Sequence, residues 1–227
     1  MRVAIGILTH NPLSSLRFAL LEQTINSLRA AFDESERVIR ILDNGSTDGS
    51  ADVLADLGAI RYEPGDGNSS PGRGRNVLMG ELLKGDPELV VLSDDDVTWK
   101  PEAGAFLRSF WSCAPDDVAI LSGLLEPEWD WNTPRGIVDA GDVRALWRDS
   151  APAAAWTFRA RAWSDIGPLR EIIDGLGEDY HACLRLRGAN LRVAQADLAE
   201  HAGCGYSLLG NDGHYRDKPL DRQKWGI

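Results

Sequence analysis

Three consecutive carboxylates, Asp94, Asp95 and Asp96, follow directly after an apolar run over residues 89–92. A short apolar run with two valines predicts a buried strand, and open α/β sheets bind their ligands at the carboxyl ends of such strands. Like charges this close repel one another, and a divalent cation relieves that repulsion. Oxygen ligands suit magnesium, manganese or calcium. The run therefore indicates a metal–phosphate site. The alternatives are a solvated acidic turn or an acid-rich helix N-terminus, because a helical pattern begins at Pro101.

The elements ahead of these acids are predicted to alternate between strands and helices. Residues 3–8 are apolar on both faces, which is typical of a central parallel strand. A second strand over 38–42 ends at Asp43, and a third covers 59–62. The helix after the first strand has one apolar face with helical spacing. Five residues form this face: Phe18, Leu21, Ile25, Leu28 and Phe32.

Two more helices complete the alternation in the first half. A short one is expected after Thr47 as its N-cap, residues 63–74 form a polar loop, and residues 75–83 form the next helix. This order predicts an α/β fold with a Rossmann-like, mostly parallel sheet flanked by helices. Three strand ends then line one crevice: Thr9, Asp43 and Asp94.

The second half of the sequence is less regular. A helix is expected to open at Glu178 and to end at Gly188, and a short helix begins at Ala160. Three strands are expected, over residues 118–121, 154–159 and 191–194. Residues 126–149 have no clear period and contain Trp129, Trp131 and Trp147, so they form either a loop over the core edge or a wall for a sugar ring.

The length, charge and cysteine content of the chain exclude several classes of protein. The 227 residues suit one large domain, and the net charge of −11 argues against nucleic acid or an anionic membrane as partner, because basic residues hold both. No apolar run approaches the ~20 residues that span a bilayer, and the N-terminus lacks the form of a signal peptide. Three widely spaced cysteines suggest neither a metal pair nor a disulfide framework. We therefore expect a cytoplasmic protein without a membrane span.

Several short motifs occur in a specific order, although each is weak alone. In the first half they are Thr9-His10-Asn11, Asp43-Asn44-Gly45-Ser46-Thr47-Asp48-Gly49-Ser50, Gly74-Arg75-Asn76 and Asp94-Asp95-Asp96. In the second half they are Phe158-Arg159, Ile166-Gly167, Gly177-Glu178-Asp179, Leu184-Arg185-Leu186, Gly188 and His201. This ordered set, over nearly the whole chain, resembles the inverting nucleotide-sugar glycosyltransferases of family 2, which have the GT-A fold.

The resemblance implies both an architecture and an activity. A single glycosyltransferase domain over 1–227 would have a nucleotide-binding half over 1–100, a smaller acceptor-binding half over 101–209, and a tail over 210–227. The activity would be metal-dependent transfer of a sugar from a UDP-, GDP- or dTDP-sugar to an acceptor hydroxyl. The cofactor would be Mn²⁺ or Mg²⁺, and the sequence does not identify the acceptor.

The resemblance also assigns binding roles to particular residues. Asp43 would accept a hydrogen bond from the N–H of a uracil-like base, with Thr9 and Asn11 beside it. Arg75 and Asn76 would contact the nucleotide sugar, Arg75 by pairing with a phosphate or with an acid of the run.

The metal ligands implied by the resemblance are Asp96 and the late histidine His201. Asp94 and Asp95 would contact the nucleotide sugar or a metal-bound water. The three-acid run departs from the family's Asp-x-Asp motif, and this leaves open whether Asp94 or Asp95 works with Asp96. A second departure is Asn44, where the family has Asp.

Glycosyl transfer also requires that the acceptor hydroxyl lose its proton, and a general base contributes about 10²–10⁴-fold to such a step. We expect Asp179 to be this base, with Glu178 beside it, because both lie at a predicted helix start where the dipole favours the ionised form. A single base opposite the leaving group gives inversion. If Asp179 only positions the acceptor, retention is the alternative outcome, because retaining enzymes share this fold.

Two other functions fit parts of the sequence. A sugar-1-phosphate nucleotidyltransferase uses a similar sheet, but its Gly-rich basic loop is missing after the first strand, where Thr9-His10-Asn11-Pro12 stands. A catalytically silent GT-A-like binding domain would keep the fold alone, and the intact acids at 43, 94–96 and 178–179 argue against it.

Overall fold

A mixed sheet of ten strands forms the centre of the protein in a computed structural model that describes residues 1–14, 17–63, 65, 70–124, 133–171 and 177–201. Within these residues the strand order is β3-β2-β1-β4-β9-β6-β10-β8-β7, and β5 pairs with β10 outside this path. None of the described helices is long and apolar enough to cross a membrane. Trp129, Trp131 and the tail predicted over 210–227 lie outside the described residues.

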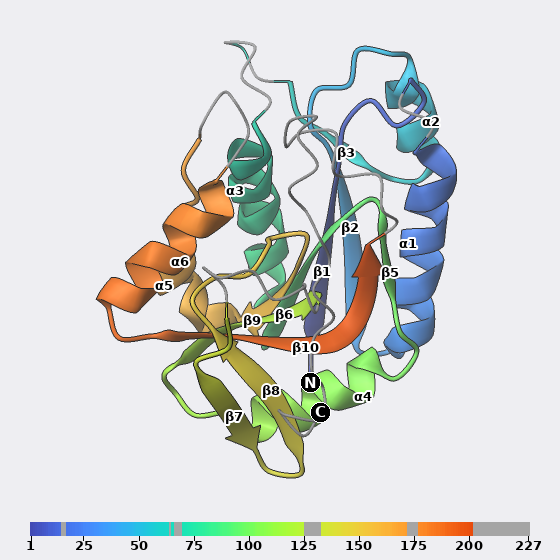
Figure 1. Cartoon of the computed structure of the whole chain (residues 1–227). Helices are drawn as coiled ribbons and strands as arrows, with labels where there is room; N and C mark the ends of the chain where they lie inside the picture. Colours follow the sequence, from blue (N-terminus) through green and yellow to red (C-terminus); the bar gives the residue numbers. More distant parts are fainter. Residues whose placement is uncertain (15–16, 64, 66–69, 125–132, 172–176, 202–227) are drawn as a thin grey trace.

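Parallel strands make up the first half of the sheet (Figure 1). β1 (Val3–Thr9) pairs with β2 (Arg37–Asp43) on one side and with β4 (Leu89–Asp94) on the other, and β3 (Ile60–Arg61) extends the sheet beyond β2. β1 is buried along its whole length, as predicted for a central parallel strand. The α/β architecture expected from the sequence is therefore confirmed.

Antiparallel pairs dominate the second half, so the sheet as a whole is mixed rather than mostly parallel. β9 (Ala155–Arg159) runs antiparallel to both β4 and β6 (Val118–Leu124). β10 (Arg192–His201) is parallel to β6 but antiparallel to β5 (Val97–Trp99). Two neighbouring parallel strands must be joined by a long crossover, usually a helix. The chain instead reaches β9 directly from a hairpin, and β9 runs antiparallel to both of its neighbours.

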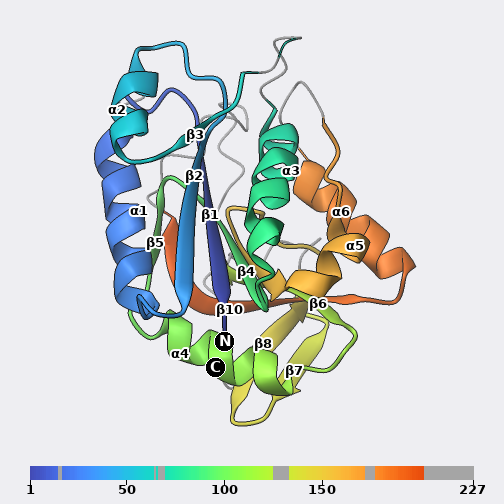
Figure 2. The same cartoon turned by 180° about the vertical axis from the view of Figure 1, so that it is seen from behind.

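Helices cover both faces of the sheet (Figures 1 and 2). One face carries α1 (Phe18–Ala31) and α4 (Ala103–Cys113), and the other carries α3 (Pro71–Leu82) and α6 (Glu178–Gly188). α2 (Ser50–Asp56) follows β2, and α5 (Trp163–Ile166) precedes α6. Short 3-10 turns cover Leu83–Gly85 and Ala160–Ala162.

The predicted apolar face of the first helix is the face that meets the core. Leu21, Ile25, Leu28 and Phe32 are buried, and Phe18 is half-buried. The spacing of these residues therefore placed α1 correctly against the sheet.

The segment over 126–149 contains a hairpin that the sequence analysis did not predict. β7 (Gly136–Ala140) pairs antiparallel with β8 (Val143–Arg148), and Trp147 lies within β8 opposite Gly136. This tryptophan is therefore part of the sheet, and the prediction of an irregular segment is wrong for these residues.

Other boundaries also differ from the prediction. α3 starts at Pro71 rather than at Arg75, because Ser70 caps it by accepting a 3.4 Å hydrogen bond from the N–H of Arg73 and proline suits the first helical position. Gly49, not Thr47, precedes α2 as the N-cap. β10 continues beyond residue 194 as far as His201.

Two glycines let α3 approach its neighbours closely. A Cβ atom on Gly72 would lie 2.3 Å from the carbonyl oxygen of Arg170 and 3.3 Å from Cβ of Glu178. A Cβ atom on Gly74 would lie 2.8 Å from Cγ of Asn44. The absence of side chains at these positions thus sets how near α3 lies to the end of β2 and the start of α6.

We expect Gly72→Ala to lower the free energy of unfolding by about 1–3 kcal/mol, because the clashing atom belongs to the backbone and cannot rotate away. Gly80→Ala on the same helix is the matched control, since no atom lies within 4 Å of a Cβ there. The control should be neutral or stabilising by up to ~1 kcal/mol. Urea unfolding followed by circular dichroism measures both, and equal effects would contradict the close approach at Gly72.

Candidate active site

The carboxyl ends of three parallel strands bring predicted site residues to one edge of the sheet. Thr9 at the end of β1 lies opposite Asp43 at the end of β2, and Leu8 lies opposite Asp94 of β4. The three strand ends that were expected to line one crevice are therefore immediate neighbours.

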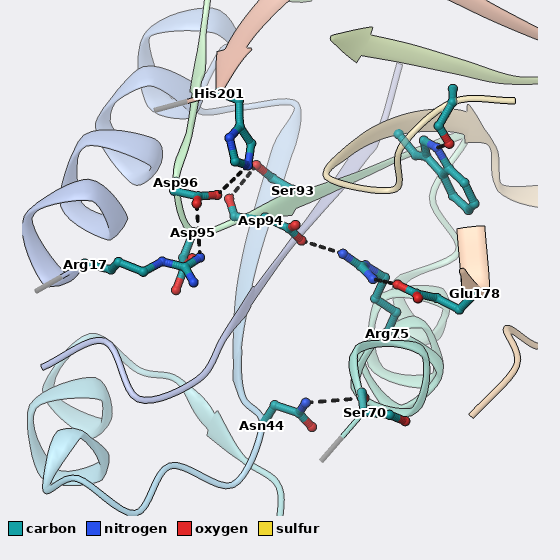
Figure 3. A network of polar contacts seen from close by, with 12 residues as sticks. Arg17, Asn44, Ser70, Arg75, Ser93, Asp94, Asp95, Asp96, Glu178 and His201 are labelled. Atoms are coloured by element: carbon teal, nitrogen blue, oxygen red, sulfur yellow. Dashed lines mark hydrogen bonds and ion pairs between the residues drawn. The ribbon is translucent and has the colours of Figure 1, made fainter. Parts of the chain in front are cut away.

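The three consecutive acids at the end of β4 each face one or two polar partners (Figure 3). These partners are Arg75 for Asp94, Thr9 and Arg17 for Asp95, and Arg17 and His201 for Asp96. Arg75 and Arg17, the latter shared by Asp95 and Asp96, reduce the repulsion that three adjacent carboxylates would otherwise experience.

Asp95 faces the protein interior and is only 1% exposed. Its Oδ2 accepts a 2.6 Å hydrogen bond from the Thr9 hydroxyl, and its Oδ1 forms an ion pair with Arg17. Burial raises the pKa of Asp95 to about 6, although Arg17 and Thr9 favour the charged form. Both oxygens of Asp95 therefore have partners inside the protein.

Asp96 and His201 meet because β5 pairs with the end of β10. Val97, the residue after Asp96, lies opposite His201 in this antiparallel pair, and His201 Nε2 is 3.2 Å from Asp96 Oδ1. Burial acts to raise the pKa of Asp96, but His201 and Arg17 outweigh it and hold that pKa below its usual value. Asp96 in turn raises the pKa of His201 against the opposing effect of burial.

Arg75 joins the acid run to the start of α6. Its guanidinium is 2.6 Å from Asp94 Oδ1 through Nη2 and 2.5 Å from Glu178 Oε1 through Nη1, and the residue is 5% exposed. Burial acts to lower the pKa of Arg75, but Asp94 and Glu178 raise it above its ordinary value. The arginine therefore stays charged and ties two distant segments together.

The two adjacent acids of α6 have different surroundings. Glu178 is buried against Arg75, and burial raises its pKa while Arg75 works to lower it. Asp179 is half-buried, and its Oδ1 accepts a 2.7 Å hydrogen bond from the N–H of Tyr180. Of the two carboxylates, Asp179 is the one that is partly open to a substrate.

Asp43 is fully buried at the end of β2. Its Oδ1 accepts a 2.9 Å hydrogen bond from the N–H of Ser46, whereas Oδ2 has no hydrogen-bond donor among the residues that the structure describes. A buried carboxylate oxygen without a donor is costly, and a ligand N–H would remove that cost.

Asn11 and Asn76 hold loops in place. The side-chain oxygen of Asn11 accepts a 2.7 Å hydrogen bond from the N–H of Thr47, which ties the loop after β1 to the loop after β2. The Asn76 amide makes two hydrogen bonds with the backbone of Leu169, at 2.7 and 2.9 Å. Asn11 thus lies beside Asp43 and its loop, whereas Asn76 holds the segment that contains Leu169.

Arg17 is a site residue that the sequence analysis missed. It occupies the N-cap position of α1, where the helix dipole disfavours a cation. Burial acts to lower the pKa of Arg17, but Asp95, Asp96 and Asp94 together raise it. In the sequence, Arg17 is a basic residue at a helix start with no acidic residue close by. This pattern indicates that a carboxylate from a distant segment neutralises the arginine.

Asp96 and His201 offer a carboxylate and an imidazole to a divalent cation. Ligands 2.0–2.1 Å from Mg²⁺ in adjacent octahedral positions are about 3 Å apart, which agrees with the 3.2 Å between Asp96 Oδ1 and His201 Nε2. No group of three or more acidic, histidine or cysteine residues among the described residues is placed to hold a metal. Among the described residues, Asp96 and His201 are thus two side chains whose spacing is compatible with a shared cation.

A comparison with protein families matches more than half of the chain. The profile of glycosyl transferase family 2 matches residues 5–124, which include the ends of β1, β2 and β4 and the acid run. No curated protein matches the sequence.

Solved structures show the same fold at low sequence identity. A crystal structure of S. aureus TarS residues 1–349 has a TM-score of 0.58 and 17% identity, covering 87% of this chain and 58% of that one. The mannosyltransferase PcManGT from Pyrobaculum calidifontis, in complex with GDP-Man and Mn²⁺, has a TM-score of 0.55 and 15% identity, covering 86% and 56%. This chain thus spans little more than half the length of either structure.

Proposed function

The chain belongs to glycosyl transferase family 2, and on this premise we propose that it moves a sugar from a nucleoside-diphosphate sugar to an acceptor hydroxyl with the help of a divalent cation. The observation that carries the proposal is the buried Asp94–Arg75–Glu178 bridge, which connects the acid run with the start of α6 (Figure 3). This bridge connects the proposed donor site with the proposed base. Holding two bound substrates in a fixed relative position favours a reaction between them.

The donor nucleoside is assigned to the ends of β1 and β2. Asp43 Oδ2 would accept a hydrogen bond from an imide N–H of the base, because it is buried and lacks a donor among the described residues. Asn11 borders the same place through its bond to Thr47. Asn76 and Thr9 would act indirectly, by holding Leu169 and Asp95.

The leaving diphosphate is assigned to the side of Asp94, Asp96 and His201. A divalent cation, Mn²⁺ or Mg²⁺, would supply positive charge to the diphosphate as the glycosidic bond breaks. Asp96 and His201 would hold that cation directly, and Asp94 would contact the ribose or a coordinated water. The Mn²⁺ in the mannosyltransferase neighbour supports this choice of cofactor.

Asp179 is assigned as the base that takes the acceptor proton, and Glu178 as the residue that fixes the start of α6 through Arg75. Asp179 is half-buried and lies beside this bridge, so it can meet a hydroxyl that enters from solvent. One base acting on the face opposite the leaving group gives inversion, which NMR of the product's anomeric proton tests.

A thermal-shift screen followed by product analysis tests the proposed function. UDP, GDP and dTDP are each added with and without Mn²⁺, because a ligand that binds only the folded state raises the melting temperature. Stabilisation by a nucleoside diphosphate that requires the metal, followed by transfer from the matching donor sugar in mass spectrometry, is the expected result. Preference for a triphosphate with a sugar phosphate would instead support a nucleotidyltransferase, and no response to any nucleotide would support a silent domain.

We expect Asp96→Ala to remove the metal-dependent part of the nucleotide stabilisation, because Asp96 is the carboxylate next to His201. Asp142→Ala removes the same charge from an exposed position in the β7–β8 hairpin and serves as the control. Calorimetric titration with Mn²⁺ in the presence of the nucleotide measures the loss. A variant with the parent's Mn²⁺ affinity would show that the metal ligands lie elsewhere.

A further inference from the structure

The two oxygens of Asp96 face different groups. Oδ2 lies 3.3 Å from a guanidinium nitrogen of Arg17, and Oδ1 lies 3.2 Å from Nε2 of His201. Oδ1 is buried and makes no aligned hydrogen bond with any described residue, although His201 is within ion-pair distance. One oxygen is thus held by the protein, and the other points to the group that would share a cation with it.

Arg17 cannot leave this position easily. The same guanidinium nitrogen, Nη2, also pairs with Asp95, which is 1% exposed and is held on its other side by Thr9. Withdrawal of Arg17 would leave a buried carboxylate without its cation, which is strongly unfavourable. Asp95 therefore anchors Arg17, and Arg17 in turn restrains Asp96.

We propose that Arg17 makes Asp96 a one-oxygen metal ligand and thereby selects small octahedral cations, Mg²⁺ and Mn²⁺, against Ca²⁺. This inference rests on the proposed function, which supplies the metal. Mg²⁺ needs near-ideal octahedral geometry, which the narrow bite of a two-oxygen carboxylate does not match, whereas Ca²⁺ accepts six to eight ligands and two-oxygen carboxylates. A carboxylate with one oxygen blocked by a guanidinium therefore favours Mg²⁺ and Mn²⁺ over Ca²⁺.

The test compares Mn²⁺ and Ca²⁺ binding in three variants by calorimetric titration in the presence of UDP or GDP, whichever stabilises the wild type. Arg17→Met frees Asp96 Oδ2 but leaves Asp95 unpaired, so it can fail to fold. Arg17→Met/Asp95→Asn frees the same oxygen without a buried lone charge, because asparagine can still accept the Thr9 hydrogen bond. Asp95→Asn alone removes the same buried charge but retains the Arg17 guanidinium, which can still pair with Asp96 Oδ2, and it is the matched control.

In wild type and Asp95→Asn we expect Mn²⁺ to bind much more tightly than Ca²⁺. In the double variant, the ratio of the Ca²⁺ to the Mn²⁺ dissociation constant should fall by about tenfold, because Asp96 can then bind Ca²⁺ through both oxygens. Arg29→Met, at an exposed position in the last turn of α1, should leave the ratio unchanged.

The inference is overturned if the double variant keeps the wild-type ratio while still binding Mn²⁺. A wild-type protein that binds neither cation in the presence of any nucleoside diphosphate would instead contradict the proposed metal dependence. The two failures are therefore distinguishable in one set of titrations.

Discussion

Replacing Arg75 with methionine should lower the free energy of unfolding by about 3–5 kcal/mol, the range found when one partner of a buried ion pair is removed. Arg75 is 5% exposed and faces Asp94 and Glu178, of which Glu178 is itself buried. The variant would leave Glu178 without its cation in a site that water barely reaches. Urea unfolding measures this loss of stability.

The same variant should reduce sugar transfer by two or more decades, beyond any loss from unfolding, because Arg75 positions both the donor side and the base side of the proposed site. Activity is therefore measured at a temperature where the variant remains folded by circular dichroism. Arg75→Lys should recover only part of the activity, since one ammonium cannot reproduce the planar fork that reaches two carboxylates.

Arg144→Met is the matched control for Arg75→Met. Arg144 also pairs with a carboxylate, Asp139, but both side chains are more than half exposed, at 59% and 69%. Exposed pairs contribute about 0–1 kcal/mol, so this variant should keep its stability and activity. A loss at Arg75 no larger than that at Arg144 would show that the buried bridge does not organise the site.

The strand ends were predictable from the sequence because their positions follow from local patterns. Thr9, Asp43 and Asp94 each terminate an apolar run, and the carboxyl ends of parallel strands meet at one edge. The structure confirms this through the register of β1 with β2 and β4. The apolar runs that indicate strands, and the parallel direction of those strands, were sufficient to predict this part of the site.

The meeting of Asp96 and His201 could not be derived from local patterns. β10 shifts register against β6 between Gln195 and Ala199, and such irregularities bend a strand and redirect its side chains. β10 therefore continues past its apolar run and pairs with the short strand β5, which places His201 beside Asp96. Only tertiary pairing determines this contact, and the resemblance to a family was the sole sequence-based reason to expect it.

The sequence did not predict the start of α3, because two glycines lie at its N-terminal end. Gly72 and Gly74 have low helix propensity, so the sequence predicted a loop there. Their lack of side chains is what allows α3 to approach Asn44 and Glu178, and this approach positions Arg75. Local propensity and the needs of the site conflict at these residues, as is expected where function sets the sequence.

The second large effect is expected at Asp179. Asp179→Asn should reduce transfer by about two to four decades while donor and metal binding stay nearly unchanged, because a general base contributes roughly 10²–10⁴-fold and the proposed donor contacts lie on other segments. The substitution preserves structure, since the asparagine oxygen can still accept the 2.7 Å hydrogen bond that Asp179 accepts from Tyr180. Initial rates under saturating donor, with nucleotide affinity from calorimetry, separate the two quantities.

Glu178→Gln provides the contrast that identifies the base. Because Glu178 holds Arg75, its loss should weaken stability and donor binding as well as transfer, whereas loss of a base affects transfer alone. Wild-type turnover in Asp179→Asn would rule that residue out as the base. A selective loss of turnover in Glu178→Gln would move the role one position along α6, to a carboxylate that would then have to leave Arg75 during each reaction.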